Sequence, residues 1–139
     1  MSETVLEDPF ATVPGDAEAA RQGRSSMKLV SCVIRPESLE AVTAALSQLE
    51  VLGGMTLTDV RGFGRQKGQV EHYRGGEYTI RFLPKVKVEI AVHAKDAEDV
   101  ITAIGRAART GQVGDGKVFV SDVHHAMRIR TGERGPSAL

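Results

Sequence analysis

The stretch GFGRQKGQVEHYRGGEYTIRFLPKVKVEI, from Gly62 to Ile90, contains two patterns that belong to different kinds of structure. Its last part alternates apolar and charged residues, as the two faces of a strand do. Its first part is polar, rich in glycine and carries two tyrosines. Compact domains rarely keep a polar excursion of this length without a function for it. The stretch therefore predicts a long functional loop that leads into a strand.

Two apolar runs and a helix precede this loop. MKLVSCVI, residues 27–34, is a short apolar run that is typical of a buried strand. Residues 38–49 place apolar side chains at steps of three and four, which indicates one face of a helix, and Gly53-Gly54 is expected to end that helix. MTLTDVR, residues 55–61, predicts a second strand that runs into the loop.

The same order of elements recurs after the loop. RFLPKVKVEIAV, residues 81–92, predicts a third strand. Asp96 is the expected N-cap of a second helix, with Asp99 three residues on as a variant of the capping box, and Gly111 is expected to end that helix. KVFVSDV, residues 117–123, predicts a fourth strand, and the remainder, HHAMRIRTGERGPSAL, is expected to be polar and flexible.

Two consecutive strand–helix–strand units predict an α+β domain of the ferredoxin-like βαββαβ type, with an antiparallel sheet and one helix from each half on one face. The other face would stay open, and the alternating aliphatic residues indicate self-association there. Residues 1–26 are acidic, contain two prolines and sustain no apolar period, so we expect a flexible extension. Met27, directly after it, is an alternative start.

Bulk composition excludes several classes of protein. The 139 residues include 18 basic and 18 acidic side chains, which argues against nonspecific nucleic-acid binding through a strongly basic face. Cys32 is the only cysteine and lies in an apolar run, so a buried thiol is expected rather than a disulfide or a zinc site. The chain contains neither a signal-peptide core nor an apolar stretch long enough to span a membrane, and a cytoplasmic location without membrane insertion is expected.

Three glycine-containing or basic clusters indicate an anion site. In GFGRQKG, residues 62–68, glycines allow backbone amides close to a ligand, although the spacing fits neither a P-loop nor a dinucleotide fingerprint. In TGQVGDGKVFV, residues 110–120, a glycine turn precedes Lys117. In RIRTGERG, residues 128–135, Arg128 and Arg130 would point the same way in an extended chain and suit a phosphate. The alternatives are a loop edge, a tight turn and a solvated basic tail.

The fourth cluster is the loop itself, in which Tyr73 and Tyr78 flank a short glycine-rich tip. Such a polar loop buries too little apolar surface to hold one shape by itself. It can be ordered by a ligand at its base and recognised by a partner at its tip. Tyr78 would offer its hydroxyl to a modifying enzyme. The alternative is a disordered hairpin.

Five motifs, GFGRQKG, YRGGEY, FLPKVKVEI, AARTGQVGDGKVFV and RIRTGERG, together resemble the PII family of nitrogen regulatory proteins, over residues 27–139. The resemblance implies a homotrimer of ferredoxin-like subunits, with nucleotide sites between neighbours. It identifies residues 27–139 as the PII domain and the loop, at about 63–81, as the family's T-loop. It also implies a nonenzymatic, allosteric signalling protein that binds ATP or ADP and, with Mg²⁺, 2-oxoglutarate, and that regulates targets through the T-loop.

The resemblance also assigns the ligands. Those expected for ATP or ADP are Thr56, Gly62, Arg65, Gln66, Lys67, Gly114, Asp115, Gly116, Lys117, Arg128 and Arg130. Those expected for 2-oxoglutarate are Arg35, Gly64, Gln66, Lys67, Gly68 and Lys85. Gln66 would be the side-chain ligand of Mg²⁺.

The implied targets are ammonium transporters, nucleotidyl-transferases and metabolic enzymes. Tyr78 matches the tyrosine that is nucleotidylylated in some members, whereas Gly76 replaces a serine that others phosphorylate. Arg81 and Glu37 depart from the family pattern and put the identity of the partner in doubt. Two alternatives stay open: a weak ATPase, and a repurposed module that senses adenine nucleotides with another small anion such as bicarbonate.

Overall fold

The computed structural model describes residues 25–50, 53–64, 70–73 and 77–139. The elements run β1 (Met27–Ile34), η1 (Pro36–Ser38), α2 (Leu39–Ser47), β2 (Thr56–Gly62), β3 (Val70–Tyr73), β4 (Glu77–Ile80), β5 (Leu83–His93), η3 (Ala94–Asp96), α3 (Ala97–Ala108), β6 (Gly116–Val123) and η4 (Gly135–Ala138). The main sheet has the order β2-β5-β1-β6, and its neighbours are antiparallel. The predicted ferredoxin-like α+β fold is thereby confirmed.

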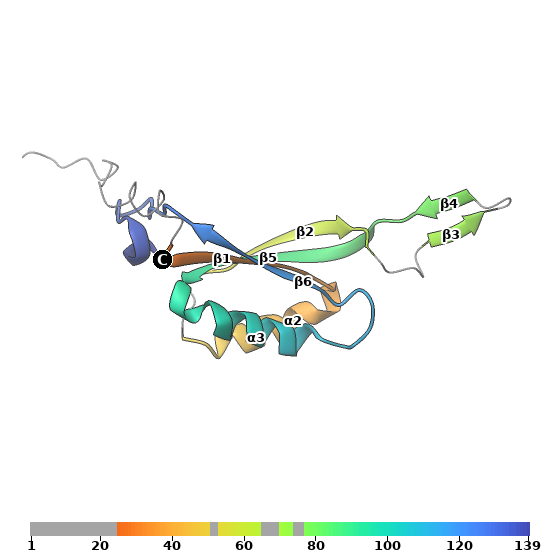
Figure 1. The fold of residues 1–139 in the computed structure, drawn as a ribbon, viewed down its shortest axis with the longest axis horizontal. Coiled ribbons are helices and arrows are strands. Elements are labelled where there is room, and N and C mark those ends of the chain that lie inside the picture. Colours follow the sequence, from red (N-terminus) through yellow and green to blue (C-terminus); the bar gives the residue numbers. More distant parts are fainter. Residues whose placement is uncertain (1–24, 51–52, 65–69, 74–76) are drawn as a thin grey trace, which may run out of the picture.

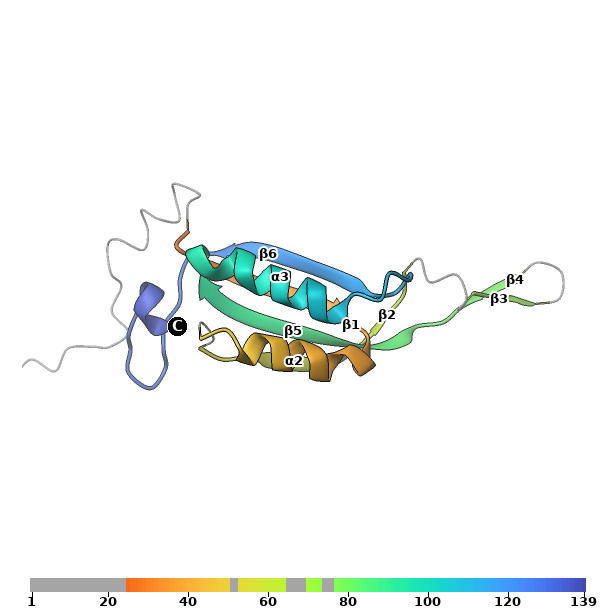
Figure 2. The same cartoon turned by 90° about the horizontal axis from the view of Figure 1, so that it is seen from below.

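Both helices cover the same face of the main sheet (Figure 1), where they lie side by side (Figure 2). Strand residues on that face alternate with residues on the open face, so every second side chain enters the core. The core joins these strand residues to the apolar stripes of the two helices. Its buried members are Val30, Cys32, Ile34, Val42, Leu46, Val86, Val88, Ile90, Val92, Ala97, Val100, Ile104 and Ala108. Cys32 is fully buried, as expected.

The open face of the sheet mixes apolar and charged side chains. Leu29 and Val33 of β1 alternate with the core residues and so point to this face. Phe119 of β6, paired with Ser31, lies on the same face and keeps 59% of its surface exposed. Lys87 and Glu89 of β5 form an ion pair there at 3.6 Å. The face therefore carries apolar surface that a single chain leaves uncovered.

Element boundaries differ from the prediction at several points. Helix α2 ends at Ser47, before Gly53-Gly54, because a turn at Gln48 already closes it through bonds to the preceding carbonyls. Asp96 is the N-cap of α3, but its side chain makes no capping hydrogen bond. The short helix η3 runs directly into α3, so Asp96 has φ −98° and ψ −8° instead of the extended backbone that a capping side chain needs.

The expectation of a flexible segment after β6 is wrong. The amide of Arg128 donates to the carbonyl of Glu133 at 2.8 Å, and that of Gly132 donates to Arg128 at 2.7 Å. The amide of Gly135 donates to Ala126 at 3.0 Å and leads into η4. Gly132 and Gly135 have φ of 74° and 72°, a region that glycine adopts without strain. These two glycines allow the segment to fold back on itself.

Residues 1–24 of the expected N-terminal extension lie outside the described residues, but Ser25 and Ser26 do not. The Ser25 hydroxyl lies 2.8 Å from the carbonyl oxygen of Met27 and also contacts the carbonyl of Val123 at the end of β6. The amide of Ala94, after β5, donates to the carbonyl of Ser26 at 2.7 Å. The two serines thus link the ends of three strands.

A two-stranded sheet of β3 and β4 extends beyond the main sheet, at the end opposite η4 (Figures 1 and 2). It occupies the predicted T-loop, for which we expected no regular structure. Its register pairs Val70 with Ile80 and His72 with Tyr78. The alternation in VEHY and EYTI allows a paired backbone without a core of its own. The described part of the loop therefore pairs as a hairpin, and β4 leads into β5.

Candidate functional site

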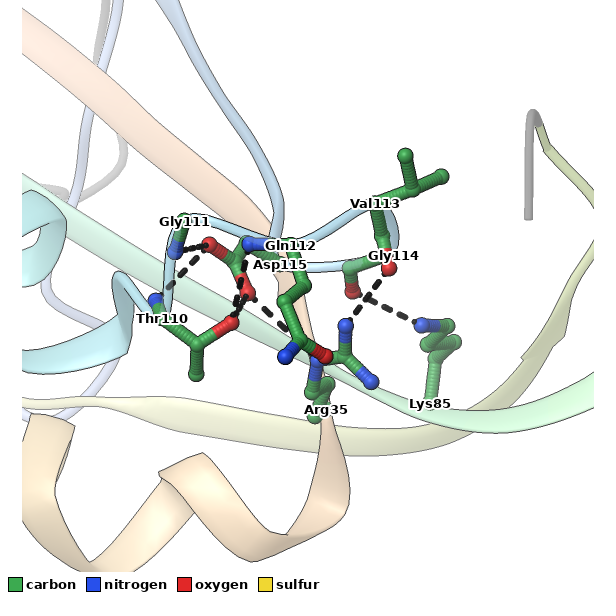
Figure 3. Close-up of polar contacts among 8 residues, drawn as sticks. All are labelled: Arg35, Lys85, Thr110, Gly111, Gln112, Val113, Gly114 and Asp115. Carbon is green, nitrogen blue, oxygen red and sulfur yellow. Dashed lines mark hydrogen bonds and ion pairs between the residues drawn. The ribbon is translucent and has the colours of Figure 1, made fainter.

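The loop between α3 and β6 is folded around the carboxylate of Asp115 (Figure 3). One carboxylate oxygen accepts hydrogen bonds from the amides of Thr110 and Gly111, each at 2.8 Å, and the other accepts one from the Thr110 hydroxyl. These bonds, led by that from the Thr110 hydroxyl, lower the pKa of Asp115 to about 2. The carboxylate of Asp115 thus holds the shape of its own loop, and the expected place of this residue in a phosphate cradle stays a prediction.

Two cationic side chains from the sheet reach this loop (Figure 3). Arg35, directly after β1, donates from Nη2 to the carbonyl of Val113 at 2.6 Å, and its Nε lies 3.5 Å from Oδ1 of Asp115. Lys85, near the start of β5, donates from Nζ to the carbonyl of Gly114 at 3.0 Å. The Nε of Arg35 is buried and makes no hydrogen bond, so its contact with Asp115 is an ion pair only.

The electrostatics of this cluster favour an added anion. Burial lowers the pKa of Lys85, and the neighbouring Arg35 guanidinium lowers it further. Glu37 and Asp115 act in the opposite direction with smaller effects. Two cations that repel each other beside a glycine turn are stabilised by a negative ligand between them. The family resemblance implied that Arg35 and Lys85 share one ligand, and the structure brings the two side chains to one loop.

Two glycines leave room at this site, and Gly116 is the one that the backbone requires. Gly116 has φ of 114°, and a Cβ built there would lie 2.0 Å from the carbonyl oxygen of Val33. A Cβ on Gly62, the last residue of β2, would lie 3.2 Å from Cγ of Lys85. Gly116 therefore allows the loop to approach β1, and Gly62 leaves room for the lysine stem.

Three other residues predicted to bind the nucleotide lie outside the 110–116 loop. Lys117 is exposed on β6, and Thr56 begins β2, opposite Glu89 of β5. Arg128 donates from Nη1 to Glu133 and from Nη2 to the main-chain oxygen of Leu139, each at 3.0 Å.

The expectation that Arg128 and Arg130 project together from an extended chain is wrong. Residues 129–131 form a turn, closed by the bond from the Gly132 amide to Arg128. Arg130 is exposed in this turn.

Part of the predicted ligand set is not described. Arg65, Gln66, Lys67 and Gly68 lie outside the described residues, as does Gly76 at the hairpin tip. Gly64 is described and exposed. The backbone of Tyr78 lies in β4. These assignments stay predictions.

Sequence reasoning missed several residues that shape the two clusters. Thr110 and Val113 contribute a hydroxyl and a carbonyl to the loop, and Glu133 and Leu139 hold Arg128. A threonine five residues before an aspartate across a glycine turn is a local signal that could have indicated the Asp115 contact. The Leu139 contact depends on a main-chain oxygen, for which a sequence carries no signal.

Metal ligands and membrane spans were searched among the described residues. In those ranges no group of three or more His, Cys, Asp or Glu side chains is placed to hold a metal ion. None of the helices in the described part of the chain is long and apolar enough to cross a membrane.

Comparisons with known proteins identify the family of the chain. Residues 27–133 match the family model for nitrogen regulatory protein P-II. The chain is 50% identical to nitrogen regulatory protein GlnK of Escherichia coli K12, over 81% of this chain and 100% of that protein. It is 52% identical to nitrogen regulatory protein P-II of Rhizobium meliloti, with the same coverage.

A solved structure gives the same result. The crystal structure of Arabidopsis thaliana PII bound to citrate matches with a TM-score of 0.68 and 39% sequence identity, over 84% of this chain and 94% of that one. Both the sequence and the fold therefore match the same group of regulatory signalling proteins. The chain belongs to the P-II family of nitrogen regulatory proteins.

Proposed function

We propose that this chain senses ATP or ADP together with 2-oxoglutarate, in the cytoplasm, and reports their levels to target proteins through the β3–β4 hairpin. One observation carries the proposal: Arg35 and Lys85 both reach the 110–116 loop, whose shape Asp115 already holds. Charged donors beside a folded glycine turn suit phosphates and carboxylates. A sensor needs binding and no chemical step, so the proposed protein is not an enzyme.

Magnesium is part of the proposal. The metal would supply the positive charge that lets a triphosphate and a dicarboxylate lie side by side. Gln66 is its proposed side-chain ligand. The described side chains fit the anionic ligands rather than the metal, because Arg35 and Lys85 are cationic. They would hold a carboxylate at the edge of the loop.

The position of Lys85 links binding to the output. Lys85 lies near the start of β5, close to where the chain returns from the hairpin. An anion that draws Lys85 away from the carbonyl of Gly114 would favour one orientation of the hairpin base over another. Ammonium transporters, nucleotidyl-transferases and metabolic enzymes are the proposed targets of the hairpin, and Tyr78 is its proposed modification site.

Calorimetric titration of 2-oxoglutarate, with Mg-ATP and without it, tests the proposal. We expect binding only with Mg-ATP, and we expect Lys85→Gln to abolish it. Lys87→Gln is the matched control, because Lys87 lies on the same face of β5 and pairs with Glu89 instead. ATP binding without any response to 2-oxoglutarate would overturn the proposed effector.

A second candidate is a sensor for another anion. The Arabidopsis relative is described as bound to citrate, and bicarbonate is the smaller alternative. Titrations of citrate and bicarbonate under the same conditions distinguish the candidates. Saturable binding of either, in place of 2-oxoglutarate, would support this second function.

Arg130 tests the nucleotide part of the proposal. Arg130→Ala should weaken ATP binding by roughly 1–3 kcal/mol, the range for losing a hydrogen bond to a charged group. Arg106→Ala, on the exposed side of α3, is the control. An ATP affinity that is equal in both variants and the parent protein would remove Arg130 from the site.

A further inference from the structure

A hollow of about 530 Å³ is lined by residues of β2, β5 and η4, and η4 lies at the end of the sheet opposite the hairpin (Figure 1). Thr56 of β2 and Glu89 of β5, which are register partners, line it from the sheet. Ala138 and Leu139, at the end of η4, line it from the other side. Thr56 is one of the residues proposed to contact the nucleotide. The last residues of the chain therefore border the same space as a proposed nucleotide ligand.

The main chain of Leu139 approaches the wall of this hollow closely. A Cβ built on Gly53 would lie 2.9 Å from the carbonyl carbon of Leu139, a distance that side chains do not tolerate. The next residue, Gly54, has space: its Cβ would meet nothing within 4 Å. Only a glycine at position 53 thus permits the observed position of Leu139.

Leu139 also engages the proposed phosphate ligand Arg128. Both terminal nitrogens of this guanidinium are used, one by Glu133 and one by the main-chain oxygen of Leu139, each at 3.0 Å. Each terminal nitrogen carries two N–H donors, and one of each pair is taken here, so a phosphate that approached Arg128 from the side of these contacts would have to displace Glu133 and Leu139. Leu139 therefore borders the hollow and holds Arg128 at the same time.

The segment Gly135–Leu139 is ordered by bonds of its own. The amide of Gly135 donates to Ala126 at 3.0 Å, and that of Leu139 donates to Pro136 at 3.3 Å. Gly135 is buried. These bonds present the Leu139 oxygen to Arg128 as part of a folded turn, which lowers the entropy cost of the contact.

We propose that segment 135–139 is a built-in competitor of the nucleotide. It borders the hollow beside Thr56 and accepts a hydrogen bond from Arg128, and a nucleotide that uses this side of Arg128 must displace it. This inference rests on the function proposed above. When the binding-competent state is only a fraction of the population, the apparent affinity falls by that fraction. The segment would therefore set the nucleotide concentration at which the sensor responds.

Two changes to the full chain release the segment by different routes. In the first, the chain stops at Ser137. This removes the Leu139 oxygen that Arg128 binds, and it removes Ala138 and Leu139, the two residues of the segment that border the hollow. In the second, Gly53→Ala places a methyl group against Leu139 and leaves the segment intact. Gly54→Ala is the matched control for segment release, because its Cβ contacts nothing.

The readouts are ATP affinity by calorimetry and amide hydrogen exchange of residues 135–139. We expect both releasing changes to tighten ATP binding about fivefold or more, the lower end of typical coupling between sites. Gly53→Ala should speed exchange in the segment, and Gly54→Ala should not. Because coupling is reciprocal, ATP should also speed this exchange in the parent protein.

The outcomes separate the two proposals. ATP affinity that is unchanged or weaker in both releasing variants, while the parent binds ATP, overturns the competitor and leaves the sensor standing. Slower exchange of the segment on ATP addition would likewise overturn it. ATP binding that the parent lacks and both variants gain would support a complete block by the segment. No ATP binding by any of these proteins would overturn the sensor, and the competitor with it.

Discussion

Gly116 shows how one residue determines the position of the 110–116 loop, the candidate anion site. An alanine there would combine a positive φ with a Cβ 2.0 Å from the Val33 carbonyl, so β1 and the loop would have to separate. We expect Gly116→Ala to lower the free energy of unfolding by about 1–3 kcal/mol, measured by denaturant titration. Gly105→Ala on α3, whose Cβ meets nothing within 4 Å, should raise it by about 0.5–1 kcal/mol. An equal free energy of unfolding for Gly116→Ala and the parent protein would contradict the close approach of Gly116 to the Val33 carbonyl.

Asp115 gives the loop a dependence on pH. Its pKa is about 2 in the folded protein, below the ordinary value of 3.8, so its contribution to stability is complete above that value and is lost as pH falls toward 2. Denaturant midpoints measured between pH 5 and 2 should therefore fall for the parent protein. Asp115→Asn should be less stable at pH 5 and lose less on acidification. If the denaturant midpoints of the parent protein and of Asp115→Asn fell in parallel with pH, Asp115 would not stabilise the fold in this way.

Individual site residues were predictable to different degrees. Arg35 and Lys85 were predicted for 2-oxoglutarate and the glycine turn at 114–116 for the nucleotide, and the structure places both cations at that turn, while the ligands stay predictions. The internal role of Asp115 was not predicted, because it depends on how the loop closes on Thr110. Arg128 was predicted as a phosphate ligand, but its partners Glu133 and Leu139 follow from a turn that spacing along an extended chain does not describe.

At the scale of elements, apolar periodicity predicted the two helices and four strands of the main fold, and their ends were less accurate. Helix α2 stops at Ser47 and β5 starts at Leu83, in each case inside the predicted limits. The hairpin strands β3 and β4 and the turn before η4 were not predicted. Main-chain pairing defines these parts, and a hydrophobic pattern carries no signal for main-chain bonds.

Ser25 and Ser26 make a testable boundary for the folded domain. A chain that starts at Ser25 keeps the contacts to Val123 and Ala94, whereas one that starts at Met27 loses both. We expect the shorter chain to be less stable by about 1–3 kcal/mol, the net contribution of two hydrogen bonds. Its ATP affinity should equal that of the longer chain, because the hydrogen bonds of the two serines go to Met27, Val123 and Ala94, which are not among the proposed nucleotide ligands. Equal denaturant midpoints would make the serines dispensable.

At the scale of the whole molecule, the open sheet face is the surface on which the predicted homotrimer depends. Phe119 is exposed on this face, at the edge strand β6. Burying an aromatic side chain contributes about 1.5–3 kcal/mol, and burying an unpaired charge costs more than that. We expect trimers for the parent protein by light scattering after gel filtration, and smaller species for Phe119→Glu. Thr102→Glu on the exposed side of α3 should stay trimeric.

The outcome of that measurement also bears on the site. A parent protein that is monomeric at micromolar concentration would contradict the predicted assembly and every site placed between neighbours. The fold class followed from the order of elements, whereas assembly depends on how two surfaces fit, and a single sequence does not contain that information.

The bonds of Asp115 to Thr110 and Gly111 have a consequence for kinetics. A loop that is folded before its ligand arrives needs no slow ordering step of its own, so encounter should limit the association of an anion that binds at this loop without displacing segment 135–139. With Arg35 and Lys85 already turned toward the loop, electrostatic attraction should accelerate that encounter. The association rate constant of an anion that binds at this loop should then fall steeply as ionic strength rises, while its dissociation rate constant changes little.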